Sequence, residues 1–146
     1  SIRRQRQMCI RDSPVEAAIA EKFHAIVNLD LRNSRMKDFY DIWMLSRTLS
    51  FVGETLSQSI RATFDRRQTA LPAALPAAFT AQFYADPTHV RQWRAFVGRI
   101  GETSLAYEFP RIIGDLTEFL MPAAKASVGS ANNPARWLPE GPWQHE

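Results

Sequence analysis

A lysine and an aspartate, each at the edge of an apolar helix face, are the first side chains that could do chemistry. Lys22 falls in a segment, residues 14–28, whose apolar residues recur at helical spacing. At about 100° per residue, it lies within about 60° of the centre of the apolar stripe. Such a lysine either extends its ammonium group to water or holds an anionic ligand. Ala18 and Ala25 sit beside it, and their small side chains leave room for a ligand.

Asp38 heads the apolar face of a second expected helix. It shares the i, i+4, i+7, i+11 series with Ile42, Leu45 and Leu49. An acid in this position either marks a site or is a first-turn aspartate favoured by the helix dipole. Asp41 projects away from Asp38, and we expect it to be a surface acid.

Three cations surround the expected start of this second helix: Arg32, Arg35 and Lys37. A helix N-terminus ringed with positive charge is suited to bind phosphate. The alternative is a solvated charged loop. Of these cations, Arg35 and Lys37 join Lys22 of the first helix as the candidate phosphate-binding residues.

The histidines do not indicate a metal site. Glu21-x-x-His24 matches half of a di-iron motif, but the sequence holds no second half, and His24 is expected to point away from Lys22. His89 and His145 stand alone. The sequence has no glycine-rich phosphate loop, no zinc spacing and no nucleophile elbow. We therefore predict no metal ligands in this chain.

About five helices must position these side chains, so the expected fold class is mainly α. Periodicity predicts helices over residues 14–28, 36–49, 54–67, 87–100 and from 110 onward. Asp86 and Pro87 form a good helix start, and Asn33-Ser34 provides an N-cap signal for the second helix. Pro122 either bends or ends the last helix. The alanine- and proline-rich residues 69–78 are predicted to be a loop, and residues 49–52 a single short edge strand.

Length and composition are those of one globular domain. The chain has 146 residues, 45% of them hydrophobic, and a net charge of +3, which permits a polyanionic partner without requiring one. Its single cysteine excludes an internal disulfide and favours a reducing, cytoplasmic environment. No apolar run is long enough to span a bilayer, so no membrane partner is expected.

The two ends of the chain are expected to be flexible and to lie outside the helical domain of residues 14–128. Residues 1–13 are basic and lack helical or strand periodicity; they resemble translated adapter sequence, the alternative being a disordered basic arm. Residues 129–146 contain glycine, asparagine and proline, with Trp137 and Trp143 among them. This composition predicts a loose tail.

Several motifs together resemble the AbiEii/AbiGii-type nucleotidyltransferase toxin family. They are Ala-Glu-Lys-Phe-His-Ala-Ile at 20–26, Asn-Ser-Arg-Met-Lys-Asp-Phe-Tyr-Asp-Ile-Trp at 33–43, Ile-Arg-Ala-Thr-Phe-Asp-Arg-Arg at 60–67 and Gln-Trp-Arg-Ala-Phe at 92–96. The closing Arg-Trp-Leu-Pro and Gly-Pro-Trp also look similar. The resemblance covers roughly residues 14–143.

This resemblance implies the helical C-terminal domain of a nucleotidyltransferase-fold protein. It implies that Lys22 and Asp38 are the family's catalytic lysine and aspartate. The complete enzyme would use Mg²⁺ to transfer a nucleotide from a nucleoside triphosphate to an RNA acceptor such as tRNA, or to a protein. Its setting would be a toxin–antitoxin system of the abortive-infection type, used in phage defence, with a cognate antitoxin as partner.

One feature of the family is missing from the sequence. No Gly-Ser turn followed by an acid-x-acid pair occurs, so we expect a fragment that is inactive alone, with its magnesium ligands outside this chain. The alternative is a non-catalytic helical module that binds nucleic acid or a partner protein. If Lys22 and Asp38 serve one nucleotide site, the first two helices should be neighbours. Both side chains should then border one cleft, with Arg35 and Lys37 near its rim.

Overall fold

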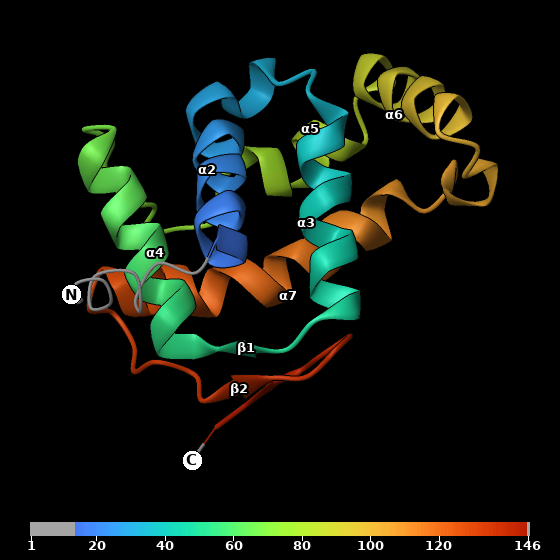
Figure 1. Ribbon diagram of the computed structural model, residues 1–146. Coiled ribbons are helices and arrows are strands. Elements are labelled where there is room, and N and C mark those ends of the chain that lie inside the picture. Colours follow the sequence, from blue (N-terminus) through green and yellow to red (C-terminus); the bar gives the residue numbers. More distant parts are fainter. Residues whose placement is uncertain (1–13, 146) are drawn as a thin grey trace.

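The computed structural model describes residues 14–145 as a helical domain with a small sheet at one end (Figure 1). The α-helices are α2 (Pro14–Leu29), α3 (Met36–Thr48), α4 (Gly53–Arg66), α5 (Ala81–Tyr84), α6 (Pro87–Arg99) and α7 (Phe109–Ser127). Short 3₁₀ turns lie at η2 (Asp30–Arg32), η3 (Ala77–Phe79) and η4 (Thr103–Leu105). The mainly α prediction is confirmed. The expectation for residues 1–13 lies outside the described residues.

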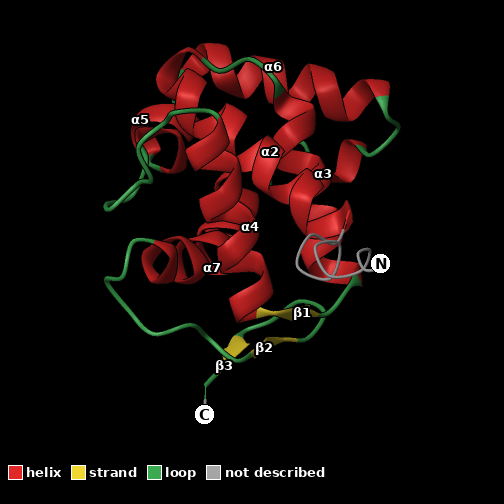
Figure 2. Cartoon of the chain, turned by 60° about the vertical axis from the view of Figure 1, so that its left-hand side comes forward, coloured by secondary structure: helices red, strands yellow, loops and turns green. Residues whose placement is uncertain are grey.

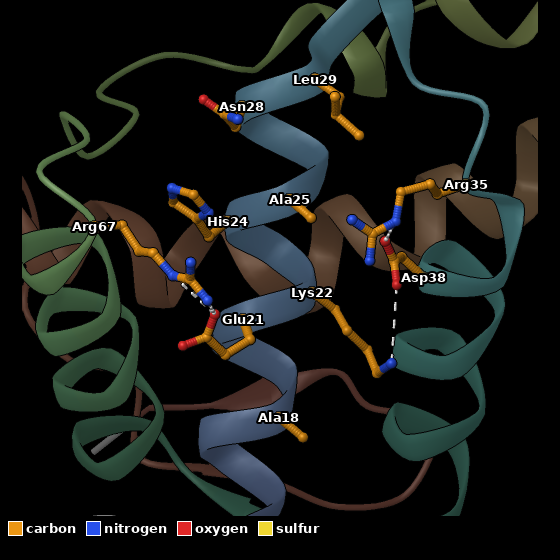
Figure 3. A pocket seen from close by; sticks show the side chains of 10 residues that line it. All are labelled: Ala18, Glu21, Lys22, His24, Ala25, Asn28, Leu29, Arg35, Asp38 and Arg67. Carbon is orange, nitrogen blue, oxygen red and sulfur yellow. Dashed lines mark hydrogen bonds and ion pairs between the residues drawn. The ribbon is translucent and has the colours of Figure 1, made fainter.

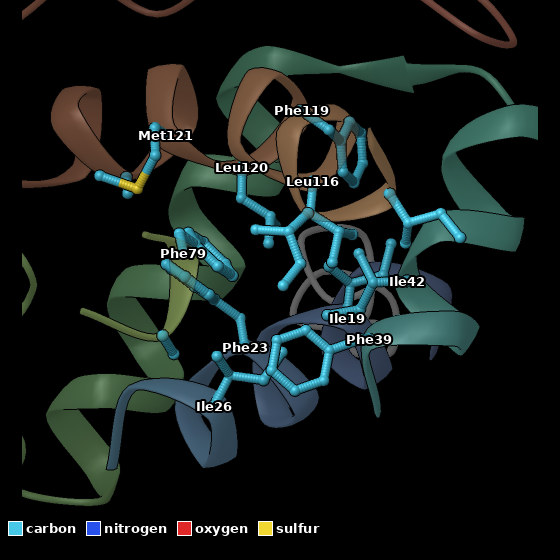
Figure 4. Close-up of a cluster of buried hydrophobic side chains, with 14 of the residues drawn as sticks. Ile19, Phe23, Ile26, Phe39, Ile42, Phe79, Leu116, Phe119, Leu120 and Met121 are labelled. Carbon is cyan, nitrogen blue, oxygen red and sulfur yellow. The ribbon is translucent and has the colours of Figure 1, made fainter. Parts of the chain in front are cut away.

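Helix α7 crosses beneath α2, α3 and α4 and supplies one side of the core (Figure 1). The apolar stripes expected from the periodicity meet there, as Figure 4 shows. The fully buried side chains at this junction are Ile19, Phe23, Ile26, Phe39, Ile42, Leu116, Phe119 and Leu120. Burying one such side chain stabilises the fold by about 1.5–3 kcal/mol. Apolar burial on α7 therefore fixes how α2 and α3 lie beside each other.

Of the two helix starts predicted from the sequence, the one at Asp86 is confirmed and the one at Asn33-Ser34 is not. Asp86 caps α6 as expected, and its carboxylate accepts hydrogen bonds from the backbone N–H groups of Thr88 and His89. The N-cap predicted at Asn33-Ser34 is wrong, because the N-cap of α3 is Arg35 and no side chain caps it. Asn33 is fully buried and its Oδ1 accepts a hydrogen bond from the Arg35 N–H, at 2.6 Å. The amide therefore fixes the turn before α3 instead of capping the helix.

Two segments contain more helix than the sequence indicated. Within the predicted loop, η3 begins at Ala77 and is followed by α5, whose Phe83 is fully buried. In α7 the chain continues helically past Pro122 to Ser127. Ala123 and Ala124 are fully buried, so packing holds the last turns of this helix together.

The predicted loose tail is corrected by the structure. Strands β1 (Phe51–Val52), β2 (Arg136–Trp137) and β3 (Trp143–Gln144) form an antiparallel sheet in that order (Figure 2). The indole N–H groups of Trp137 and Trp143 donate to the carbonyls of Ser46 and Phe119, at 2.7 and 2.8 Å. Large apolar rings with satisfied N–H groups anchor a segment whose glycines and prolines suggested disorder. The short edge strand at Phe51 is confirmed.

None of the helices described between residues 14 and 145 combines the length and apolarity needed to cross a bilayer.

Candidate functional site

A pocket of about 620 Å³ lies over α2, between the end of α4 and the start of α3 (Figure 3). Ala18, Lys22 and Ala25 on α2 form part of its floor, and Arg67 lies at one side of it. Arg35 and Asp38 line the opposite side. The two alanines keep the floor low, which is what the sequence suggested.

Lys22 and Asp38, the two candidate catalytic residues, meet at this pocket. The Lys22 Nζ lies 3.8 Å from Asp38 Oδ1, and the Arg35 Nε lies 3.0 Å from Asp38 Oδ2. The helices that carry them pack side by side. The structure therefore brings Lys22, Arg35 and Asp38 together, while their catalytic roles remain a proposal.

Asp41 was expected to be a surface acid, but it belongs to the same ionic cluster. The Lys22 Nζ lies closer to Asp41 Oδ2, at 3.1 Å, than to Asp38, and Lys37 Nζ binds the same oxygen at 2.6 Å. Lys37 does not line the pocket, and its ammonium group pairs with Asp41. The Lys22 side chain reaches from α2 to α3, and the angular position of a residue on its helix does not reveal such a contact. The Lys37–Asp41 pair lies within α3, and its i, i+4 spacing was visible in the sequence.

Asp38 combines burial with an incompletely satisfied carboxylate. Its side chain is only 6% exposed. Burial raises the pKa of Asp38, and this outweighs the opposing effects of Arg35 and Lys22. Oδ2 accepts no hydrogen bond from the described residues, because the nearby Arg35 Nε–H is poorly aligned with it. Oδ2 is itself buried, so the raised pKa, not an exposed Oδ2, makes Asp38 a candidate proton acceptor.

The other side of the pocket contains residues that the sequence analysis did not select. Glu21 accepts hydrogen bonds from Arg66 Nη2 at 2.6 Å and from Arg67 Nη2 at 2.7 Å. Burial alone would raise the pKa of Glu21, but these two arginines hold it below its usual range. His24 also lines the pocket, where burial and the charge of Arg67 lower its pKa. The adjacent pair Arg66-Arg67 at the end of a predicted helix was the available sequence signal.

The acids of this pocket do not fit a magnesium site. Within residues 14–145, no group of three or more His, Cys, Asp or Glu residues is placed to hold a metal ion. Asp38 and Asp41 are paired with lysine and arginine side chains, and Glu21 with two arginines. The carboxylates of this pocket are therefore engaged with cationic side chains rather than arranged around a metal ion.

Comparison with known proteins gives one match. The model of the AbiEii family, described as the nucleotidyl transferase AbiEii toxin of a type IV toxin–antitoxin system, matches residues 10–115. Because the match covers most of the chain, the protein belongs to this nucleotidyltransferase family, whose type IV toxins pair with an antitoxin. The matched region begins four residues before Pro14 and ends before the tryptophan-containing tail. No curated protein and no solved structure matches the chain.

Proposed function

We propose that this chain forms the nucleotide- and acceptor-binding helical part of a toxin that transfers a nucleotide from a nucleoside triphosphate. The observation that carries the proposal is the pocket in which Lys22 and Arg35 face the buried carboxylate of Asp38. The cations would bind the triphosphate through charge-assisted hydrogen bonds. Lys37 supports them indirectly by binding Asp41.

In this mechanism Asp38 accepts a proton from the acceptor hydroxyl. The acceptor oxygen forms a bond to the α-phosphorus, and the bond from that phosphorus to the bridging oxygen breaks. Pyrophosphate leaves with the bonding electron pair. Burial raises the proton affinity of Asp38, and Lys22 and Arg35 stabilise the charge that develops on the phosphates.

The acceptor, the metal and the cellular setting complete the proposal. We favour an RNA acceptor such as tRNA, with a protein as the other candidate. Mg²⁺ in the complete enzyme would neutralise phosphate charge, and its ligands would lie outside residues 14–145. The toxin would act in the cytoplasm in phage defence and would be held in check by a cognate antitoxin.

The test replaces the two central residues at the equivalent positions of a complete, active family member. Lys22→Ala and Asp38→Ala should each abolish labelled-nucleotide transfer to tRNA and leave the melting temperature nearly unchanged. The matched controls are Lys125→Ala and Asp65→Ala, because both residues are exposed and lie outside the pocket. Loss of stability with retained transfer would indicate that the ion pairs merely hold α2 against α3, as in a non-catalytic binding module.

A further inference from the structure

Around the pocket, cations outnumber acids on both flanks of α2, although Lys37 and Arg66 lie outside the pocket lining. The mechanism above uses only one of these flanks. On the α3 side, Lys22, Arg35 and Lys37 face two acids, Asp38 and Asp41. On the α4 side, Arg66 and Arg67 share a single acid, Glu21. Each flank therefore keeps one uncompensated positive charge.

We propose that Arg67 is a second phosphate-binding residue of the site, and that it holds the outer phosphates of the nucleoside triphosphate. The proposal rests on the proposed function, because Lys22 and Asp38 define the end of the pocket where the α-phosphate reacts. Arg67 lines the same pocket from across α2 (Figure 3). It would bind the β- and γ-phosphates, which leave as pyrophosphate.

The geometry favours a long polyanion over a single phosphate. The two flanks are separated by the width of α2, and a helix with its side chains is about 10 Å across. One phosphate group cannot contact both sides of such a helix, whereas an extended triphosphate with its sugar can. Ala18 and Ala25 provide the low floor over which such a chain would lie.

Hydrogen bonds to Glu21 and Thr69 fix the position of Arg67 beside the pocket. Its Nε and Nη2 groups donate to Glu21 Oε1, at 3.2 and 2.7 Å, and Nη1 makes no hydrogen bond to any described residue. The Thr69 hydroxyl donates to the Arg67 carbonyl, so its oxygen accepts a hydrogen bond from His24 Nε2–H, at 2.8 Å. Glu21 is thus a positioning residue that fixes the Arg67 guanidinium and leaves one edge open to the pocket.

The neighbouring arginine provides a matched control. Arg66 binds the same carboxylate and is as exposed as Arg67, at 59% against 54%, but it does not line the pocket. Arg66→Ala and Arg67→Ala each remove one ion pair to Glu21. Only Arg67→Ala removes a group that faces the proposed ligand.

The experiment measures binding of a nucleoside triphosphate and the corresponding monophosphate to the whole chain by calorimetry, without added metal. Arg67→Ala should weaken triphosphate binding about tenfold and leave monophosphate binding unchanged, whereas Arg66→Ala should change either by less than twofold. Lys22→Ala should weaken binding of both nucleotides. Melting temperatures of the two arginine variants should agree.

Other outcomes separate the two proposals. Equal losses for Arg66→Ala and Arg67→Ala would show that both act only through Glu21 and would overturn the role of Arg67. A triphosphate affinity unaffected by Arg67→Ala but lowered by Lys22→Ala would overturn this inference alone. Weaker binding of a short RNA to Arg67→Ala, with unchanged triphosphate binding, would assign the arginine to the acceptor instead. If the unmodified chain bound no triphosphate, the proposed function would fail as well.

Discussion

Two acids on opposite sides of the α2 pocket show how the surroundings set the charge of a carboxylate. Asp38 is almost completely covered, and its pKa is raised because burial outweighs the nearby cations. Glu21 is 35% exposed and accepts hydrogen bonds from two arginines, so its pKa is lowered even though burial opposes this. Asp38, with its raised pKa, is therefore the acid suited to accept a proton. Glu21, with its lowered pKa, stays ionised and is suited to bind arginine side chains.

The raised pKa of Asp38 predicts that its charge destabilises the fold. Below its ordinary value of 3.8, both folded and unfolded chains bind the proton. As the pH rises above 3.8, the unfolded state ionises first, so the folded state holds more protons and stability falls. As the pH rises from 3.8 to the raised pKa, Asp38→Asn should therefore gain stability relative to the parent chain. The total gain should be about 1.4 kcal/mol for each unit that separates the folded and unfolded pKa values of Asp38.

Urea unfolding of Asp38→Asn and the parent chain between pH 4 and 7 measures this difference. A growing advantage for the parent chain at higher pH would mean that the ion pairs to Lys22 and Arg35 dominate over burial.

At the scale of elements, sequence reasoning succeeded where helical periodicity and local caps agree. It located α2, α3, α4, α6 and α7 because each carries an apolar stripe that packs on the core. It missed α5 and the two tail strands β2 and β3, which depend on contacts between distant residues such as Trp137 with Ser46. Short elements with few residues of their own carry too little periodic signal to be detected.

The same contrast applies to the site. Lys22 and Asp38 were found because a charge at the edge of an apolar stripe is visible in one helix. Arg67 and Asp41 were missed because their contacts depend on how far side chains reach between helices. A helical wheel gives the direction of Cβ but does not show where a flexible guanidinium or ammonium group ends.

The end of α4, which carries Arg67, contains a residue in an unfavourable backbone conformation. Gln68 has φ +54°, and the N–H groups of Gln68 and Thr69 donate to the carbonyls of Asp65 and Phe64. This is the arrangement that usually places glycine just after a helix, as Gly129 does after α7 with φ +80°. Gln68→Gly should therefore stabilise the chain by about 1 kcal/mol, because a side chain is disfavoured in the left-handed region.

Chemical denaturation of the glycine variant checks this prediction. Gln58→Gly is the matched control, since Gln58 is exposed within α4 and the change should destabilise the helix by about 1 kcal/mol. Destabilisation by both substitutions would show that Gln68 makes a compensating contact.

At the scale of the whole molecule, the packed helices form a frame that presents the α2 pocket. Helix α2 contributes apolar side chains to the core and the pocket floor to the outside, and α3 and α4 flank it. The tail strands anchor the opposite end through Trp137 and Trp143. Charged pocket residues are thus held by elements whose positions are set by apolar packing, which favours a preorganised binding site.

This organisation predicts that the chain alone binds a nucleoside triphosphate but does not transfer the nucleotide. The pocket has cations for the phosphates and the Asp38 carboxylate for the acceptor proton. Within residues 14–145, however, no group of three or more acids, histidines or cysteines is placed to hold a metal ion. We expect the magnesium-binding carboxylates to lie outside residues 14–145. Incubation with labelled nucleoside triphosphates, Mg²⁺ and bulk tRNA should leave the RNA unlabelled, while calorimetry on the same sample detects triphosphate binding. Strong metal-dependent labelling would show that the chain carries a complete catalytic site.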